Sequence, residues 1–312
     1  MKKIFVVFIC ILLSIYNGFA QELELNMVQI DTTPIADVTK VNSIEMLEHE
    51  VTLSLYEFVM GEKPENLKKA DENLANSFLG SFGIKTKNNK KYYYQETGIH
   101  DNHPVVGVSF YDAIYFCNRL SKLSGLKPVY AIGGYTDVDD WDYDIHTGNY
   151  IEKEITQDLH SNGYRLPTEI EWLYAAKGGE DYIYSGSNNL DDVAWYSKNS
   201  KRTTQEIKQK ETNGFKLYDM IGNVKEWTFK TKLNREIVIR NEEIKKNDGK
   251  KNADGSTTFF ISEDPLYTSV HGKSFKSSSS ECKEIWYDIN RNILSCNTQD
   301  IDLGFRIVRT VE

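Results

Sequence analysis

Residues 162–172 read NGYRLPTEIEW, and this stretch constrains the local fold more tightly than any other part of the chain. Thr168 and Glu171 stand three residues apart, the spacing at which two side chains satisfy free N–H groups in the first turn of a helix. The helix that begins there carries Trp172 and ends at the glycine pair 178–179. The stretch therefore predicts a short, capped helix that Trp172 anchors in the core.

Two further segments predict helices. Ser109 and Asp112 repeat the capping spacing, and apolar side chains then recur at helical intervals over 110–123. Residues 53–60 form a weaker helical pattern that ends at Gly61. Three helices in a chain of 312 residues leave most of the backbone to loops and short strands.

Short strands are predicted at 105–108 and 305–308. Residues 232–262 are rich in Lys, Asn and Asp and contain two turn signals, so they are predicted to be an insertion in which 257–261 forms a hairpin arm. Neither an internal repeat nor a Pro- or Ser-rich linker divides the sequence. Since helices and strands do not alternate, the pattern predicts one α+β domain over 21–312.

The first 20 residues have the organisation of a secretory signal peptide. Lys2 and Lys3 precede an unbroken apolar run over 4–13, and small residues lead up to Ala20. A membrane-spanning helix needs about 20 apolar residues, so this run is too short to anchor the protein. We predict cleavage after Ala20 and a secreted or periplasmic protein that is not an integral membrane protein.

The formal net charge is -9 and the mean hydropathy is -0.51, as in soluble acidic proteins. A chain of this balance lacks the basic face of a nucleic-acid binder, so no nucleic-acid partner is expected. Aspartates crowd residues 137–144, but the glycine and the closing glutamate of an EF-hand are missing. This segment is predicted to be a solvated acidic loop.

Three cysteines remain after the predicted cleavage: Cys117, Cys282 and Cys296. Their odd number leaves at least one without a partner inside the chain, and the sequence does not decide the pairing. Cys117 stands on the apolar stripe of a predicted helix and is expected to be a small buried residue.

The stretch 162–172 resembles the N-G-Y-R-L-P-T-E-A-E-W signature of the formylglycine-generating enzyme (sulfatase-modifying factor) family. Further segments resemble motifs of the same family in the same order: EVT at 50–52, HPVVGVSFYDA at 103–113, FKLYDMIGNVKEW at 215–227, GKSF at 272–275 and GFR at 304–306. The resemblance covers nearly the whole predicted mature chain. It implies a single compact domain with little regular secondary structure, a variant of the C-type-lectin-like fold.

The resemblance also implies a calcium site in the GNVKEW segment. The ligands would be the side chains of Asn223 and Glu226 with backbone carbonyls of Ile221 or Gly222, a mixed oxygen set that suits Ca²⁺. In the alternative interpretation, Asn223 and Glu226 cap a buried turn beside Trp227.

Active members of the family oxidise a substrate cysteine to formylglycine with two cysteines that bind copper(I). In this chain Cys282 occupies the second cysteine position, but the first holds Ser277. A hydroxyl is a hard ligand and does not replace a soft thiolate on Cu(I). The resemblance therefore implies no catalytic residues at this site and no copper cofactor.

The six histidines are too few and too scattered to predict a metal site. His100 and His103 have a suggestive spacing, but His103 belongs to the HPV motif and is expected to order the turn before Pro104.

These observations predict an exported, non-catalytic binding or scaffold protein that engages a protein or glycan in the cell envelope. Two alternatives stay open. The chain could be an active oxidoreductase of the same superfamily, with formylglycine-generating or related sulfur or hydroxylation chemistry, or a subunit of an envelope secretion or gliding apparatus. Its oligomeric state is also open.

Overall fold

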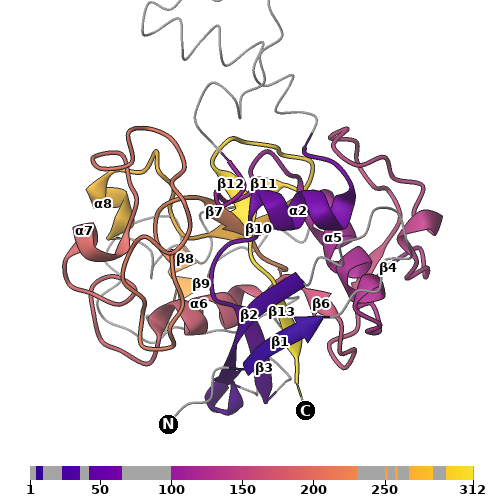
Figure 1. Ribbon diagram of the computed structural model, residues 1–312, viewed down its shortest axis with the longest axis horizontal. Coiled ribbons are helices and arrows are strands. Elements are labelled where there is room, and N and C mark those ends of the chain that lie inside the picture. Colours follow the sequence, from indigo (N-terminus) through magenta and orange to yellow (C-terminus); the bar gives the residue numbers. More distant parts are fainter. Residues whose placement is uncertain are drawn as a thin grey trace, which may run out of the picture.

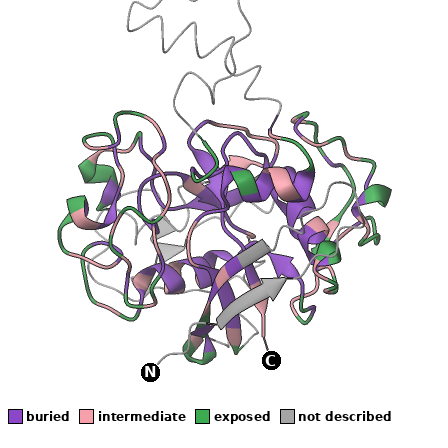
Figure 2. Ribbon diagram, viewed as in Figure 1, coloured by how far each residue is buried: buried purple, intermediate pink, exposed green. Residues whose placement is uncertain are grey.

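The computed structural model describes residues 5–9, 23–35, 42–64, 100–230, 250–251, 257–258, 267–283 and 293–311. Within these residues, short helices and strands are joined by long loops (Figure 1). Loops and regular elements both carry buried side chains, so the core extends through both (Figure 2). The structure is thus the sparse α+β domain that the sequence predicts.

The three predicted helices are α2 (Leu53–Met60), α5 (Phe110–Leu123) and α6 (Glu169–Lys177). Both predicted capping boxes form, between Ser109 and Asp112 at the start of α5 and between Thr168 and Glu171 at the start of α6. Shorter helical turns are α7 (Leu190–Val193), α8 (Ser279–Cys282), η1 (Thr33–Ile35) and η3 (Val138–Asp140).

The larger sheet has five strands in the order β1-β2-β3-β13-β6, and all neighbours are antiparallel. The strands are β1 (Phe5–Ile9), β2 (Leu23–Asp31), β3 (Ser43–Leu47), β13 (Val308–Thr310) and β6 (Tyr164–Arg165). β1 forms one edge and lies inside the predicted signal peptide. Cleavage after Ala20 would make β2 the edge strand.

The second sheet has four strands in the order β11-β10-β7-β12. These are β11 (Ile293–Ser295), β10 (Tyr267–His271), β7 (Lys225–Trp227) and β12 (Leu303–Phe305). β12 runs parallel to β7, whereas the other pairs are antiparallel. Strand β7, which belongs to the GNVKEW segment, therefore lies between two neighbours in the interior of the sheet.

The predicted strand at 305–308 is wrong as a single element. The chain leaves β12 at Phe305 and enters β13, in the other sheet, at Val308. Arg306 and Ile307, which join the two sheets, are fully buried. The break arises because Arg306 points toward a buried carboxylate.

The predicted strand at 105–108 is also absent. Val105 donates its N–H to the carbonyl of Val51 at 2.8 Å, and Pro104 forms an isolated bridge with Thr52. Gly107 then adopts φ 72°, a left-handed conformation that ends any extended run. The apolar pattern indicated burial correctly, since Val105 and the residues beside it lie in the core.

Two small antiparallel sheets complete the strands of the described residues. β4 (Tyr130–Ile132) pairs with β5 (Ile155–Gln157), and β8 (Lys250–Lys251) pairs with β9 (Thr257–Thr258). The β8–β9 pair lies in the predicted insertion, and β9 is the start of its predicted hairpin arm. The rest of 232–262 lies outside the described residues.

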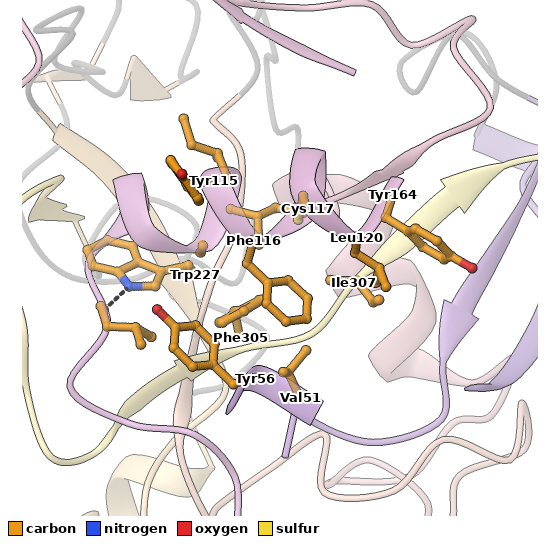
Figure 3. Packing of buried hydrophobic residues seen from close by; sticks show 14 of the residues in the cluster. Val51, Tyr56, Tyr115, Phe116, Cys117, Leu120, Tyr164, Trp227, Phe305 and Ile307 are labelled. Atoms are coloured by element: carbon orange, nitrogen blue, oxygen red, sulfur yellow. Dashed lines mark hydrogen bonds between the residues drawn. The ribbon is translucent and has the colours of Figure 1, made fainter. Parts of the chain in front are cut away.

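Aromatic rings lie at the centre of the main core (Figure 3). Tyr56 of α2 stacks on Phe116 of α5 with ring centroids 5.6 Å apart, and Phe305 of β12 meets Phe116 edge-on. Trp227 of β7 donates its indole N–H to the carbonyl of Val108 at 2.9 Å. Helices α2 and α5 and the second sheet therefore share one core. No helix in the described part of the chain is both long and apolar enough to span a membrane.

Candidate functional site

A buried ion pair joins the GNVKEW segment to the GFR segment. Arg306 donates from Nε to Oε2 of Glu226 and from a terminal nitrogen to Oε1, both at 2.7 Å. Trp172 of α6 donates its indole N–H to Oε2 of Glu226, also at 2.7 Å. All three side chains are fully buried, so this network connects three motif segments at the centre of the molecule.

A second buried ion pair explains the stretch 162–172. Arg165 of β6 forms two hydrogen bonds of 2.7 Å to the carboxylate of Glu171. The same carboxylate accepts the N–H of Thr168 at 2.8 Å, which completes the cap of α6. One acidic side chain thus serves the helix cap and neutralises a buried guanidinium.

Asn223 occupies a tight turn before β7, with φ 54°. Its Oδ1 accepts the N–H of Gln205 at 2.9 Å, and its Nδ2 donates to the carbonyl of Gln205 at 3.2 Å. Its own N–H donates to the carbonyl of Trp195 at 2.8 Å. At Gly222 an added Cβ would lie 2.4 Å from that carbonyl oxygen, so only glycine allows the two backbones to approach.

The calcium set predicted from Ile221, Gly222, Asn223 and Glu226 does not fit this geometry. Asn223 directs its side-chain oxygen to a backbone N–H, and both oxygens of Glu226 accept strong hydrogen bonds from Arg306 and Trp172. The two side chains therefore act in separate networks. The alternative interpretation, a capped turn beside Trp227, describes what they do in the structure.

Near the Arg306–Glu226 pair, unpartnered buried carboxylate oxygens belong to two other residues, Glu50 and Asp219. Both carboxylate oxygens of Glu50 lack a hydrogen-bond partner, and so does Oδ1 of Asp219. Burial, with the charges of Asp219 and Glu226 nearby, raises the pKa of Glu50 well above its usual range. Burial likewise raises the pKa of Asp219 to about 6. The sequence analysis missed both residues, although each stands in a family-like segment among apolar neighbours.

The two positions that match the family's copper cysteines have different surroundings. The Oγ of Ser277 accepts the N–H of Ser274 at 3.1 Å, in the loop before α8. Cys282, the last residue of α8, is fully buried, and this burial raises the pKa of its thiol to about 12. At neutral pH the thiol of Cys282 is therefore protonated in the metal-free protein.

Cys117, Cys282 and Cys296 are all buried, and within the described part of the chain no disulfide bond links any two of them. Cys282 packs in one core cluster, whereas Cys117 and Cys296 pack in another. A bond between Cys282 and Cys296 is therefore absent, and Cys117 is the buried helix residue that its position predicts.

The acidic segment 137–144 forms ordinary surface contacts. Asp137 caps η3 through a hydrogen bond to Asp139 N–H and pairs with Lys122 at 2.7 Å. A shallow depression beside it is lined by Asp139, Asp142 and Asp144 with Tyr115 and Tyr143. These features agree with the predicted solvated loop.

The irregular α+β frame is the fold that the resemblance to formylglycine-generating-enzyme-like domains implies. The family described as "Sulfatase-modifying factor enzyme 1-like domain" matches residues 14–311, so the chain belongs to this family.

Two curated relatives match parts of the chain. The chaperone protein LppX of Paenibacillus barcinonensis is 38% identical over 147 residues, which are 41% of this chain and 51% of that protein. The formylglycine-generating enzyme of Mycobacterium tuberculosis (strain ATCC 25618 / H37Rv) is 39% identical over 80 residues, 21% of this chain and 27% of the enzyme. The matches thus span about half of the first relative and about a quarter of the second.

Solved structures resemble the whole domain. Treponema denticola variable protein 1 matches with a TM-score of 0.60 and 24% identity, covering 93% of this chain and 96% of that one. CarF matches with a TM-score of 0.54 and 22% identity, covering 87% and 88%. At this identity the likeness concerns the fold alone.

Proposed function

We propose that this protein is an exported, non-catalytic member of the sulfatase-modifying factor family that acts by binding a protein partner in the cell envelope. The observation that carries the proposal is the state of the two copper positions. Ser277 offers a hydroxyl, and the thiol of Cys282 is buried with its pKa raised to about 12. The first copper position therefore has no thiol, and the thiol at the second position is protonated, so the two thiolates that hold Cu(I) are not present.

The loops offer the surface for a partner. Tyr135 and Tyr150 lie between β4 and β5, and 58% and 49% of their surface is exposed. Tyrosine is enriched at protein interfaces because it supplies a wide apolar ring with a polar tip. One relative is a chaperone protein, LppX, and this likeness favours a protein partner over a glycan.

The calcium proposal moves from Asn223 to the buried carboxylates. Oxygens of Glu50 and Asp219 lack hydrogen-bond partners, and Arg306 is already paired with Glu226, so a divalent cation would balance the two remaining carboxylates when both are ionised. The ion would take the free oxygens of these two residues, while Glu226 keeps its hydrogen bonds to Arg306 and Trp172. A bound Ca²⁺ would stiffen the frame from which the loops project and supply no chemistry.

A peptide assay tests the absence of catalysis. Protein treated with copper is incubated with a Cys-x-Pro-x-Arg peptide under air, and the mass of the peptide is then measured by mass spectrometry. We expect an unchanged peptide mass. The loss of mass that accompanies conversion of cysteine to an aldehyde would establish the oxidoreductase alternative instead.

The binding role needs a separate experiment. The exported protein is crosslinked in intact cells, and complexes are compared between the native chain and a variant with Tyr135→Ser and Tyr150→Ser. A defined protein complex that the double substitution weakens supports the proposal. A complex confined to known secretion or gliding machinery would favour the apparatus alternative.

A further inference from the structure

Three metal-ligand side chains from distant parts of the sequence meet at the surface of the domain. One ligand atom from each of His100, His103 and Glu206 lies within 4.8 Å of the other two, and Nε2 of His100 is 3.0 Å from Oε1 of Glu206. Among the described residues, no other three His, Cys, Asp or Glu side chains converge in this way. The group is separate from the buried carboxylates and from the copper positions.

We propose that His100, His103 and Glu206 bind a first-row divalent metal ion, with zinc as the preferred class. Two imidazole nitrogens and one carboxylate oxygen form the ligand set that Zn²⁺ accepts in sites with three protein ligands. Bonds of about 2.0–2.2 Å set tetrahedral ligands about 3.3 Å apart. The observed spacing therefore needs only side-chain adjustments.

A hydroxyl orients the buried member of the group. Nδ1 of His103 lies 3.0 Å from Oγ1 of Thr204, which engages one ring nitrogen and leaves Nε2 for an ion. Metal-binding histidines are commonly oriented through the second nitrogen in this manner.

Backbone hydrogen bonds hold the two halves of the site together. The N–H of His103 donates to the carbonyl of His100 at 2.9 Å, which closes the turn that carries both histidines. The N–H of Ile207 donates to the carbonyl of Asn102 at 3.0 Å, which ties the residue after Glu206 to the same turn. The residue before Glu206 is Gln205, whose N–H and carbonyl are both bound by Asn223. The ligands are thus positioned before an ion arrives.

Two of the three side chains are partly open to solvent, as a site that takes up an ion from solution requires. The side chains of His100 and Glu206 are 55% and 40% exposed, whereas His103 lies at the base of the site. Three protein ligands leave a fourth position of a tetrahedral ion open for water or for a side chain of a partner. The nitrogen ligands separate this site from a calcium site, because Ca²⁺ takes oxygen ligands.

Zinc titration of the chelator-stripped, dialysed protein at pH 7.5 tests the proposal. Isothermal titration calorimetry should give one zinc per chain from this group. His100→Ala and the isosteric Glu206→Gln should each raise the Kd at least tenfold. Two matched controls, His160→Ala and Glu211→Gln, replace exposed residues of the same types elsewhere on the surface and should leave the Kd unchanged.

Cobalt provides a second measurement that does not depend on the stability of a variant. Co²⁺ bound in a tetrahedral nitrogen and oxygen site should give visible absorption bands, which zinc should displace. Thr204→Val, which removes the orienting hydroxyl, should weaken cobalt binding while far-UV circular dichroism stays native. If the native protein binds no zinc, or if His100→Ala and Glu206→Gln bind as well as the controls, the contact is a surface ion pair and the proposal is wrong.

Discussion

Asn223 binds both backbone polar groups of Gln205, accepting its N–H at 2.9 Å and donating to its carbonyl at 3.2 Å. The asparagine belongs to the turn before β7, and Gln205 belongs to the loop that carries Glu206. The two hydrogen bonds therefore connect the core segment that resembles the family motif with the surface group of two histidines and a glutamate.

Replacing Asn223 should loosen that connection. Asn223→Ala removes both hydrogen bonds. It also leaves at φ 54° a residue without the polar side chain that makes this left-handed conformation tolerable for asparagine, so we expect a loss of about 2–4 kcal/mol in the free energy of unfolding. Asn223→Gly loses the same hydrogen bonds but tolerates the left-handed conformation, and should cost about 1 kcal/mol less. Urea denaturation measures both, and equal losses would show that the backbone conformation contributes nothing.

Breaking the Arg306–Glu226 pair by removing one partner should cost more stability than replacing both partners with apolar residues. Glu226→Ala leaves a buried guanidinium without its carboxylate and should cost about 3–5 kcal/mol. In the double variant Glu226→Leu with Arg306→Met, both charges are gone, and part of that loss should be recovered. Glu211→Ala, at an exposed site, should change stability by no more than about 0.5 kcal/mol. A double variant no more stable than Glu226→Ala would contradict the argument.

Local sequence signals predicted the helices well because their caps are made by neighbours in the chain. Thr168 and Glu171 are three residues apart and do what their spacing predicts. The predicted strand at 305–308 failed for the opposite reason. Arg306 is drawn into the core by Glu226, 80 residues away, and no local pattern carries that information.

The candidate sites were harder to predict, since their members are joined only by the fold. The motif drew attention to Asn223, yet the buried carboxylates near the Arg306–Glu226 pair that have unpartnered oxygens are Glu50 and Asp219. His100 and His103 gave a spacing that predicts little alone. The third ligand, Glu206, is more than 100 positions from both histidines in the sequence, so only the fold brings the three side chains together.

Calcium should stabilise the protein through Asp219. In a His100→Ala background, which removes the proposed zinc site, chelation should lower the Tm by a few degrees, because an ion that binds only the folded state stabilises it by mass action. Asp219→Asn should abolish this response and be the more stable chain in chelator, since it removes a buried negative charge that has one unpartnered oxygen. Differential scanning calorimetry measures both effects.

The calcium experiment has an outcome that separates the two interpretations of the buried carboxylates. Asn223→Ala should lower the Tm in both conditions and keep the chelator response, because its side chain binds Gln205. If chelation has no effect on the parent chain while Asp219→Asn still stabilises it, Asp219 is held as a neutral acid and calcium is not involved.

Export should produce a mature chain that begins at Gln21. The signal-peptide pattern ends at Ala20, and its removal takes away β1 and leaves β2 at the sheet edge. Intact-mass spectrometry of protein from the periplasm or the medium should give the mass of residues 21–312. Recovery of a folded, full-length chain with Met1 from the cytosol would contradict the prediction.

Cys282 should resist alkylation in the native protein. Its thiol is buried and its pKa is raised to about 12 by that burial, so the thiolate fraction stays small up to about pH 9. Iodoacetamide should label Cys282 in urea but not in buffer, as peptide mass spectrometry reports. Rapid labelling of the folded chain at pH 7.5 would mean that the thiolate is accessible, and the absence of catalysis would then rest on Ser277 alone.

Restoring the missing cysteine tests the copper positions themselves. Ser277→Cys places a second thiol in the loop before α8, where the Ser277 hydroxyl now accepts only the short local hydrogen bond from Ser274. Two soft thiolates can hold Cu(I), and metal binding lowers the pKa of a coordinating thiol. We expect the reduced variant to bind one Cu(I) that the native chain does not bind, measured by competition with a chromogenic chelator. Ser279→Cys, on the first turn of α8, is the matched control and should bind no better than the native chain. If Ser277→Cys and Ser279→Cys behave alike, Cys282 does not stand at the family's second copper position, and the absence of catalysis would then have to be argued from its burial alone.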